Sequence, residues 1–138
     1  MTDSWRQQMV REHIVTENRH DTAAMLATLA DEDPVRDEVS GKKYRGQSDV
    51  AARYEELWRA FPDFTVTPTA LHDSGSVVVM QADYVGTHKG PYRGYAATDR
   101  RFNVRLVVVF CFNDNRITSE TIYMDLAGQL RQLGLLKE

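Results

Sequence analysis

The feature that most constrains the fold is a pair of long apolar segments separated by a short polar turn. Residues 102–112 and 117–125 are rich in β-branched and aromatic side chains, and polar residues 113–116 lie between them. Such runs on either side of Asn and Asp residues predict a β-hairpin. With Asp114 and Asn115 at its tip, Phe112 pairs with Ile117, and Val104 pairs with Asp125. The chain must therefore contain an antiparallel sheet with a long, largely apolar face.

One face of this hairpin has the composition of a small-molecule site. Side chains alternate across a strand, so the expected register places a line of polar residues among apolar ones. Apolar walls that carry a few polar groups are typical of ligand pockets. The pattern predicts a hydrophobic pocket for an apolar ligand, lined by Tyr123, Trp58, Phe110, Leu106, Thr121 and Tyr84.

The opposite face of the hairpin carries Val107, Val109 and Ile122 in the same register. A monomer does not normally leave such a long apolar strip in contact with water. We therefore expect the protein to form a homodimer that is joined through this face.

The remaining pattern places helices before most of the strands. Ser4 and Asp21 are typical N-caps for two N-terminal helices, and apolar residues recur at helical spacing from Asp49 until Pro62. Segments 64–71 and 77–85 alternate as a second hairpin, and a short helix over 126–133 is expected to end at Gly134. Helices first and strands later, in 138 residues, indicate a single α+β domain over residues 1–138.

Composition and charge argue against several other classes of protein. The net charge is -3 without a basic cluster, so nucleic acid is not an expected partner. Cys111 is the only cysteine, the four histidines are scattered, and the glycines form no phosphate-binding loop, so neither a metal nor a cofactor is expected. No apolar run approaches the roughly 20 residues that span a bilayer, so a cytoplasmic protein without membrane contact is expected.

Asp125 and His88 are the candidate catalytic residues. A carboxyl at the edge of an apolar chamber has its ionised form disfavoured, which raises its pKa toward the range of a useful acid/base. Spacing alone nevertheless favours a second role for Asp125, the N-cap of the helix that begins at Leu126. His88 could shuttle a proton or donate to a substrate oxygen, and a structural loop role is equally consistent with its flanking glycines.

Five segments occur in order along nearly the whole chain: Asn-Arg-His-Asp at 18–21, Tyr-Arg-Gly at 44–46, Phe-Pro-Asp-Phe at 61–64, Gly-Thr-His-Lys-Gly at 86–90, and an Asp125-to-Gly134 segment that ends in Gln-Leu-Gly. Together they resemble the SnoaL-like polyketide cyclase and ester cyclase family of the nuclear transport factor 2-like (NTF2-like) superfamily. The resemblance implies a cone-shaped, curved mixed or antiparallel sheet whose concave face is covered by N-terminal helices. It also implies that Asp125 is the general acid/base of a ring closure and that His88 lies in the pocket. Asp99 departs from the family pattern, which has glycine there.

The first functional hypothesis is a cofactor-independent enzyme. It would cyclise or isomerise an apolar carbonyl compound, such as a polyketide or a steroid-like ligand. The alternative is a non-catalytic small-molecule-binding or dimerisation domain of the same fold. Epoxide hydrolysis would need a carboxylate–Arg–carboxylate group around one water, and Asp83, Arg105 and Asp125 share no face in the expected register.

Overall fold

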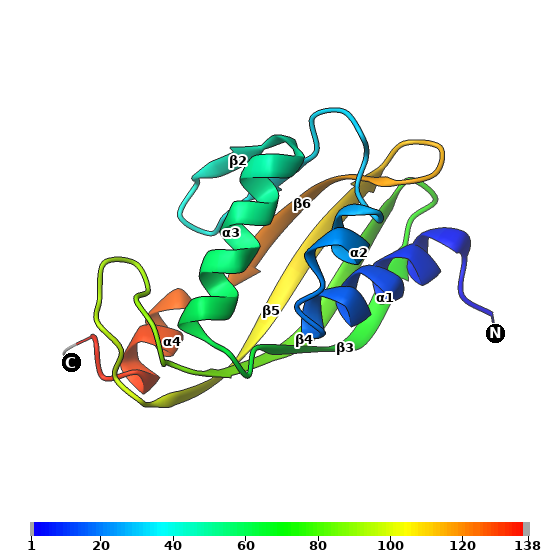
Figure 1. The fold of residues 1–138 in the computed structure, drawn as a ribbon. Coiled ribbons are helices and arrows are strands. Elements are labelled where there is room, and N and C mark those ends of the chain that lie inside the picture. The colour runs from blue at the N-terminus through cyan, green and yellow to red at the C-terminus, as the bar shows by residue number, and fades with distance from the viewer. Residues whose placement is uncertain (1, 137–138) are drawn as a thin grey trace.

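The protein folds around one curved sheet of six strands in the order β2-β1-β6-β5-β4-β3 (Figure 1). The computed structural model describes residues 2–136. β1 and β6 pair in parallel, and the other neighbouring strands pair antiparallel. The strands are β1 (Val35–Asp37), β2 (Lys43–Arg45), β3 (Thr65–Asp73), β4 (Val77–Thr87), β5 (Arg101–Phe112) and β6 (Ile117–Met124).

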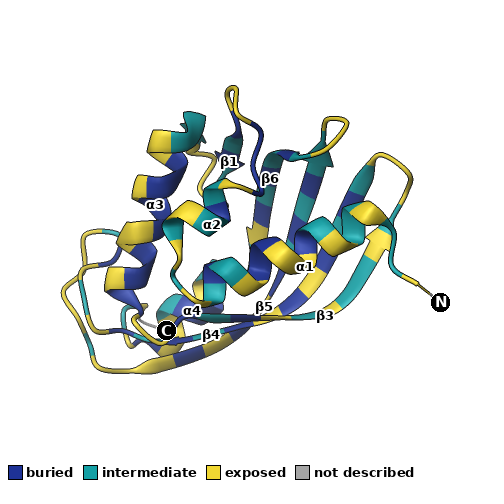
Figure 2. Ribbon diagram, turned by 45° about the vertical axis from the view of Figure 1, so that its right-hand side comes forward, coloured by how far each residue is buried: buried dark blue, intermediate teal, exposed yellow. Residues whose placement is uncertain are grey.

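Helices cover one face of this sheet. They are α1 (Trp5–Asn18), α2 (Thr22–Leu26), α3 (Gly46–Ala60) and α4 (Leu126–Gln132). α1, α2 and α3 lie over the sheet, and α4 follows β6 at one end of it (Figures 1 and 2). Ser4 and Asp21 cap α1 and α2 as expected. The predicted α+β class, with a curved sheet and N-terminal helices over one face, is confirmed. No helix within residues 2–136 is long and apolar enough to cross a membrane.

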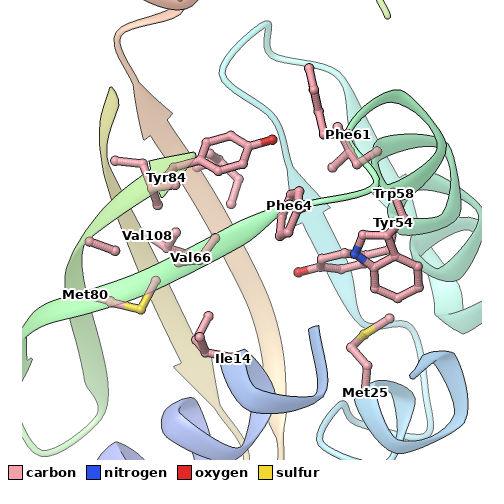
Figure 3. Close-up of a cluster of buried hydrophobic side chains, with 14 of the residues drawn as sticks. Ile14, Met25, Tyr54, Trp58, Phe61, Phe64, Val66, Met80, Tyr84 and Val108 are labelled. Carbon is pink, nitrogen blue, oxygen red and sulfur yellow. The ribbon is translucent and has the colours of Figure 1, made fainter. Parts of the chain in front are cut away.

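The core lies between the helices and the covered face of the sheet. Buried and less buried residues alternate along β4 and β5, so each strand presents one packed face and one partly exposed face (Figure 2). Large side chains fill the covered side, among them Tyr54 and Phe61 from α3 and its C-terminal end and Met80 from β4 (Figure 3). This two-layer packing leaves the outer face of the sheet half-exposed.

The register predicted for the β5–β6 hairpin is right at its first pair and wrong beyond it. Phe112 pairs with Ile117, but Cys111 pairs with Ser119, so Thr118 is an extra residue in β6. The backbone of Ile117 bonds instead to the segment before β1, donating to the Thr28 carbonyl oxygen at 3.0 Å and accepting from Ala30 N at 2.8 Å. This long-range pairing is not visible in the local hairpin pattern. In the turn, Asp114 and Asn115 do not adopt the positive φ angles of a two-residue hairpin turn, and Asn113 Oδ1 accepts hydrogen bonds from the backbone N–H groups of Asn115 and Arg116.

The bulge exchanges the two faces of β6. Glu120, Ile122 and Met124 face the core, while Thr121 and Tyr123 belong to the outer face, where Tyr123 is 57% exposed. Ile122 therefore does not lie on the predicted dimer face. Val107 and Val109 do lie on that face. The homodimer itself stays a prediction.

Candidate active site

A narrow cavity lies between the helices and the covered face of the sheet. The volume of this cavity is about 30 Å³. Met80 and Met124 contribute to the wall, and unbranched thioether side chains adapt readily to an incoming ligand. The apolar lining is Ile14, Leu57, Phe64, Val66, Met80, Leu106, Val108, Phe110, Ile122 and Met124. The polar lining is Glu17, Arg36, Glu38, Arg53, Tyr54, Tyr84, Tyr92, Arg93 and Glu120.

His13 and Glu120 form a buried ion pair beside this cavity. The Thr28 hydroxyl donates to the Met25 carbonyl, so it accepts from His13 Nδ1 at 2.8 Å. Tyr54 donates its hydroxyl proton to Glu120 Oε1 at 2.7 Å, which leaves the other carboxylate oxygen to accept from His13 Nε2 at 3.1 Å. Both ring nitrogens then carry protons. Although burial opposes it, the adjacent Glu120 carboxylate raises the pKa of His13, in agreement with this assignment.

Two arginines complete the cluster around the carboxylates of Glu38 and Glu120. Arg36 donates from Nε to Glu38 at 3.0 Å and from Nη1 to Glu120 at 3.1 Å. Arg53 donates from Nε to Glu38 at 2.6 Å. Burial raises the pKa of each carboxyl, but the facing cations outweigh it and lower the pKa of Glu38 and of Glu120 to about 2. Both carboxylates are ionised throughout the physiological range.

Glu17 differs from the other two carboxyls in the cavity. It is buried, and residues 2–136 offer its carboxyl no hydrogen bond; His13 Nε2 lies 3.7 Å away. Burial, and to a lesser degree the charge of Glu120, raise the pKa of Glu17 to about 7, against the lowering effects of His13 and Arg36. The cavity thus contains a carboxyl whose pKa lies near neutral pH, the range that suits a general acid/base.

Tyr84 supplies an unused hydrogen-bond donor to the same cavity. Its ring extends from β4 into the core (Figure 3), and no hydrogen-bond partner for its hydroxyl lies among the described residues. Burial raises the pKa of Tyr84 well above its usual value, so the hydroxyl keeps its proton. It can therefore donate to a polar atom of a ligand.

The six predicted ligand-binding residues divide into two groups. Tyr84, Phe110 and Leu106 line the cavity. Trp58 is buried outside the lining, where it stacks on His20 with ring centroids 4.9 Å apart. Thr121 and Tyr123 lie on the outer face because of the bulge in β6, so their predicted position on the pocket face is wrong.

Asp125 is exposed and caps α4. Its Oδ1 accepts from Gly128 N at 2.8 Å, and a Cβ at Gly128 would clash with Oδ2, so glycine permits this close cap. Its predicted position opposite Val104, facing the pocket, is wrong because β6 ends at Met124 and Leu106 pairs with that residue. The acid/base role of Asp125 stays a prediction.

The Asp125→Asn variant separates the two roles of this residue. Asn caps helices about as well as Asp, so we expect the free energy of unfolding to change by less than about 1 kcal/mol. Because Asp125 does not line the cavity, we also expect full activity in the exchange assay described below. A loss of about 100-fold or more at unchanged stability would instead establish Asp125 as the acid/base.

His88 is buried at the edge of the core and does not line the cavity. Its Nδ1 lies 3.0 Å from the Thr98 hydroxyl, and its ring packs against Phe61 with centroids 5.7 Å apart. Burial lowers its pKa. The backbone of the nearby Asp99 has a φ of 61°, in the left-handed region that favours glycine. The catalytic role of His88 stays a prediction.

The cluster at the cavity was missed in the sequence, although one signal was present. His13 and Glu17 lie four residues apart on the same side of α1 as Val10 and Ile14, and all four are buried. Charged residues at core positions of an amphipathic helix indicate a buried polar site. Glu120 was hidden by the register error, which assigned it to the outer face.

Comparison with known proteins agrees with this architecture. The family model described as SnoaL-like polyketide cyclase matches residues 6–133. Among solved structures, TsrD from Streptomyces laurentii is 26% identical, with a TM-score of 0.85 and 99% of both chains covered. A SnoaL-like protein from Jannaschia sp. CCS1 has a TM-score of 0.89 at 18% identity, again with 99% of both chains covered. No curated protein sequence matches the chain. The match over residues 6–133 shows that the chain belongs to the SnoaL-like polyketide cyclase family.

Proposed function

We propose that this protein catalyses proton transfer at a carbon next to a carbonyl group in an apolar small molecule, without a cofactor. The observation that carries the proposal is the Glu17 carboxyl, which faces an apolar cavity and has its pKa raised to about 7. Such a group suits cyclisation or isomerisation of a polyketide or steroid-like compound, and the name of the family refers to polyketide cyclisation. The acid/base role that the family resemblance implies for Asp125 is assigned here to Glu17.

In this mechanism the ionised Glu17 takes a proton from the carbon next to the carbonyl. The electron pair of the broken C–H bond moves toward the carbonyl oxygen and forms an enolate. The Tyr84 hydroxyl donates a hydrogen bond to that oxygen. The protonated Glu17 then returns its proton to another carbon in an isomerisation, or to the new alkoxide after the enolate carbon attacks a second carbonyl. Proton and charge are thereby restored in each cycle.

The surroundings of Glu17 stabilise both its ionised and its protonated form. His13, held as a cation by Glu120 and Thr28, lies 3.7 Å from the Glu17 carboxyl and stabilises its ionised form. Burial stabilises the protonated form. The opposing effects keep the free-energy difference between the two forms small, which is what efficient general acid/base catalysis requires.

Epoxide hydrolysis is a weaker match for the same cavity. Glu38, Arg36 and Glu120 do form a carboxylate–Arg–carboxylate group, from residues other than those considered in the sequence. Both carboxyls have a pKa of about 2, so neither carries a proton to donate to an epoxide oxygen. Among the carboxyls that line the cavity, Glu17 is the one whose pKa lets it act both as proton donor and as proton acceptor near neutral pH.

The proposal is tested by hydrogen–deuterium exchange at carbon. We expect the protein to accelerate loss of the α-proton NMR signals of 2-decalone, an apolar bicyclic ketone, in deuterated buffer at neutral pH. The Glu17→Gln variant, which keeps the shape but cannot ionise, should be slower by about 10²- to 10⁴-fold. Glu12→Gln, an exposed change on the same helix, is the matched control and should exchange at the wild-type rate. Equal rates for wild type and Glu17→Gln, or no acceleration by wild type, would refute the proposal.

A further inference from the structure

A second hollow adjoins the cavity. The two share Arg53, Tyr92 and Arg93, and the hollow also contains Glu56 and Arg59. Three arginines and one glutamate thus lie at the junction of the two hollows, which we call the rim. This rim is positively charged, although the protein as a whole has a net charge of -3.

The positive charges of the rim arginines are not equally paired with carboxylates. Arg53 is paired with Glu38 at 2.6 Å and approaches Glu56 at 3.5 Å. Arg93 has no carboxylate partner among the described residues; its guanidinium lies 5.2 Å from the Tyr92 ring. Its Nε is shielded from solvent and has no hydrogen-bond partner. A buried, unpaired donor on a charged group is costly, and an acceptor on a ligand would relieve that cost.

The backbone holds Arg93 at this junction. Tyr92 and Tyr95 exchange backbone hydrogen bonds of 3.0 and 2.8 Å, and the two residues between them, Arg93 and Gly94, have φ angles of 50° and 83°. Positive φ at both central residues is the type I′ turn, in which Asn and Gly are the usual residues. The Tyr92 hydroxyl fixes the base of this turn to α4 by donating to Gln129 Oε1 at 2.7 Å.

We propose that Arg93 binds a carboxylate on the ligand whose apolar part enters the cavity. The inference deepens the proposed function, on which it rests for the apolar part, and narrows the substrate class to apolar carbonyl compounds that carry an acid group. A guanidinium presents two parallel N–H donors to a carboxylate, so it recognises an acid over its neutral ester. Arg59, also without a carboxylate partner among the described residues, adds positive charge to the rim.

The test compares octanoate with methyl octanoate, which share one apolar chain and differ in charge. By calorimetric titration we expect wild type to bind octanoate at least about tenfold more tightly than the ester, since charge-assisted hydrogen bonds contribute at this level. Arg93→Asn removes the guanidinium and keeps a residue favoured in a type I′ turn, so the variant should fold. It should bind both compounds equally, with the affinity for the ester unchanged. Arg105→Gln, an exposed change on the outer face of β5, should retain the preference.

Three results would overturn the inference. They are equal affinities in wild type, a preference that survives in Arg93→Asn, and no binding of octanoate. Exchange of 2-decalone needs no anionic group, so the proposed function can stand when the inference fails. Conversely, a preference for octanoate that depends on Arg93, without exchange of 2-decalone, would refute the catalytic proposal alone.

Discussion

Replacement of Glu120 by alanine should lower the free energy of unfolding by about 3 to 5 kcal/mol, because it breaks a buried ion pair from one side. His13 and Arg36 would lose their shared carboxylate, and the Tyr54 hydroxyl would lose its acceptor, all within the core. Urea unfolding followed by circular dichroism measures this change. Glu12→Ala on the exposed side of α1 provides the matched control and should change stability by less than about 1 kcal/mol. A similar small effect at Glu120 would mean that the cluster does not exist as described.

The pH dependence of this contribution has a defined direction. Glu120 has a pKa of about 2 in the folded protein, below its ordinary value of 4.5. A carboxyl whose pKa is lowered by folding stabilises the folded state above its unfolded pKa, and that stabilisation disappears as the pH falls through the folded value. The difference in stability between wild type and Glu120→Ala should therefore be large at pH 6 and shrink as the pH falls from 4.5 toward 2.

Replacement of Glu17 by glutamine should change the free energy of unfolding in the opposite direction to Glu120→Ala. We expect the variant to be more stable than wild type at pH 8. The folded protein holds the Glu17 proton up to a pKa of about 7, whereas the ordinary value is 4.5. The unfolded chain releases this proton first, so wild-type stability falls as the pH rises through this interval. Glutamine does not ionise and avoids this loss. A shift of one pKa unit corresponds to about 1.4 kcal/mol, so the loss amounts to about 3 kcal/mol.

Melting curves of wild type and Glu17→Gln at pH 5 and pH 8 measure this effect. Wild type should lose stability relative to the variant between the two pH values, while Glu12→Gln should run parallel to wild type. A gain in stability that accompanies a loss of proton exchange would identify Glu17 as a residue retained for function rather than for folding. A difference between wild type and Glu17→Gln that does not vary with pH would contradict the raised pKa.

Much of the fold could be predicted from the sequence because its signals are local. The caps at Ser4 and Asp21, the helical spacing that ends before Pro62 and the alternation in both hairpins each depend on neighbouring residues. The bulge at Thr118 could not be predicted in this way, since its cause is the pairing of Ile117 with residues 28 and 30, far away in the chain. A shift of one residue moved Tyr123 to the outer face and Glu120 to the core.

The candidate site was harder to predict than the fold for the same reason. The expectation that a carboxyl beside an apolar chamber has a raised pKa describes Glu17 well, but the sequence pattern points to Asp125 as that carboxyl. Glu17 and Glu120 come from α1 and β6, and only the packed structure brings both beside His13. Sequence spacing within one element can place a residue on a face, whereas it cannot place two elements against each other.

The most direct test of the account is the titration of Glu17 itself. The carboxyl carbon of Glu17 can be followed by NMR in protein labelled with ¹³C at glutamate, with the resonance assigned by its absence from Glu17→Gln. We predict a midpoint near pH 7, the value that burial produces beside His13 and Glu120. A midpoint near 4.5, the ordinary value for glutamate, would show that the cavity does not hold the proton and would contradict the proposed mechanism.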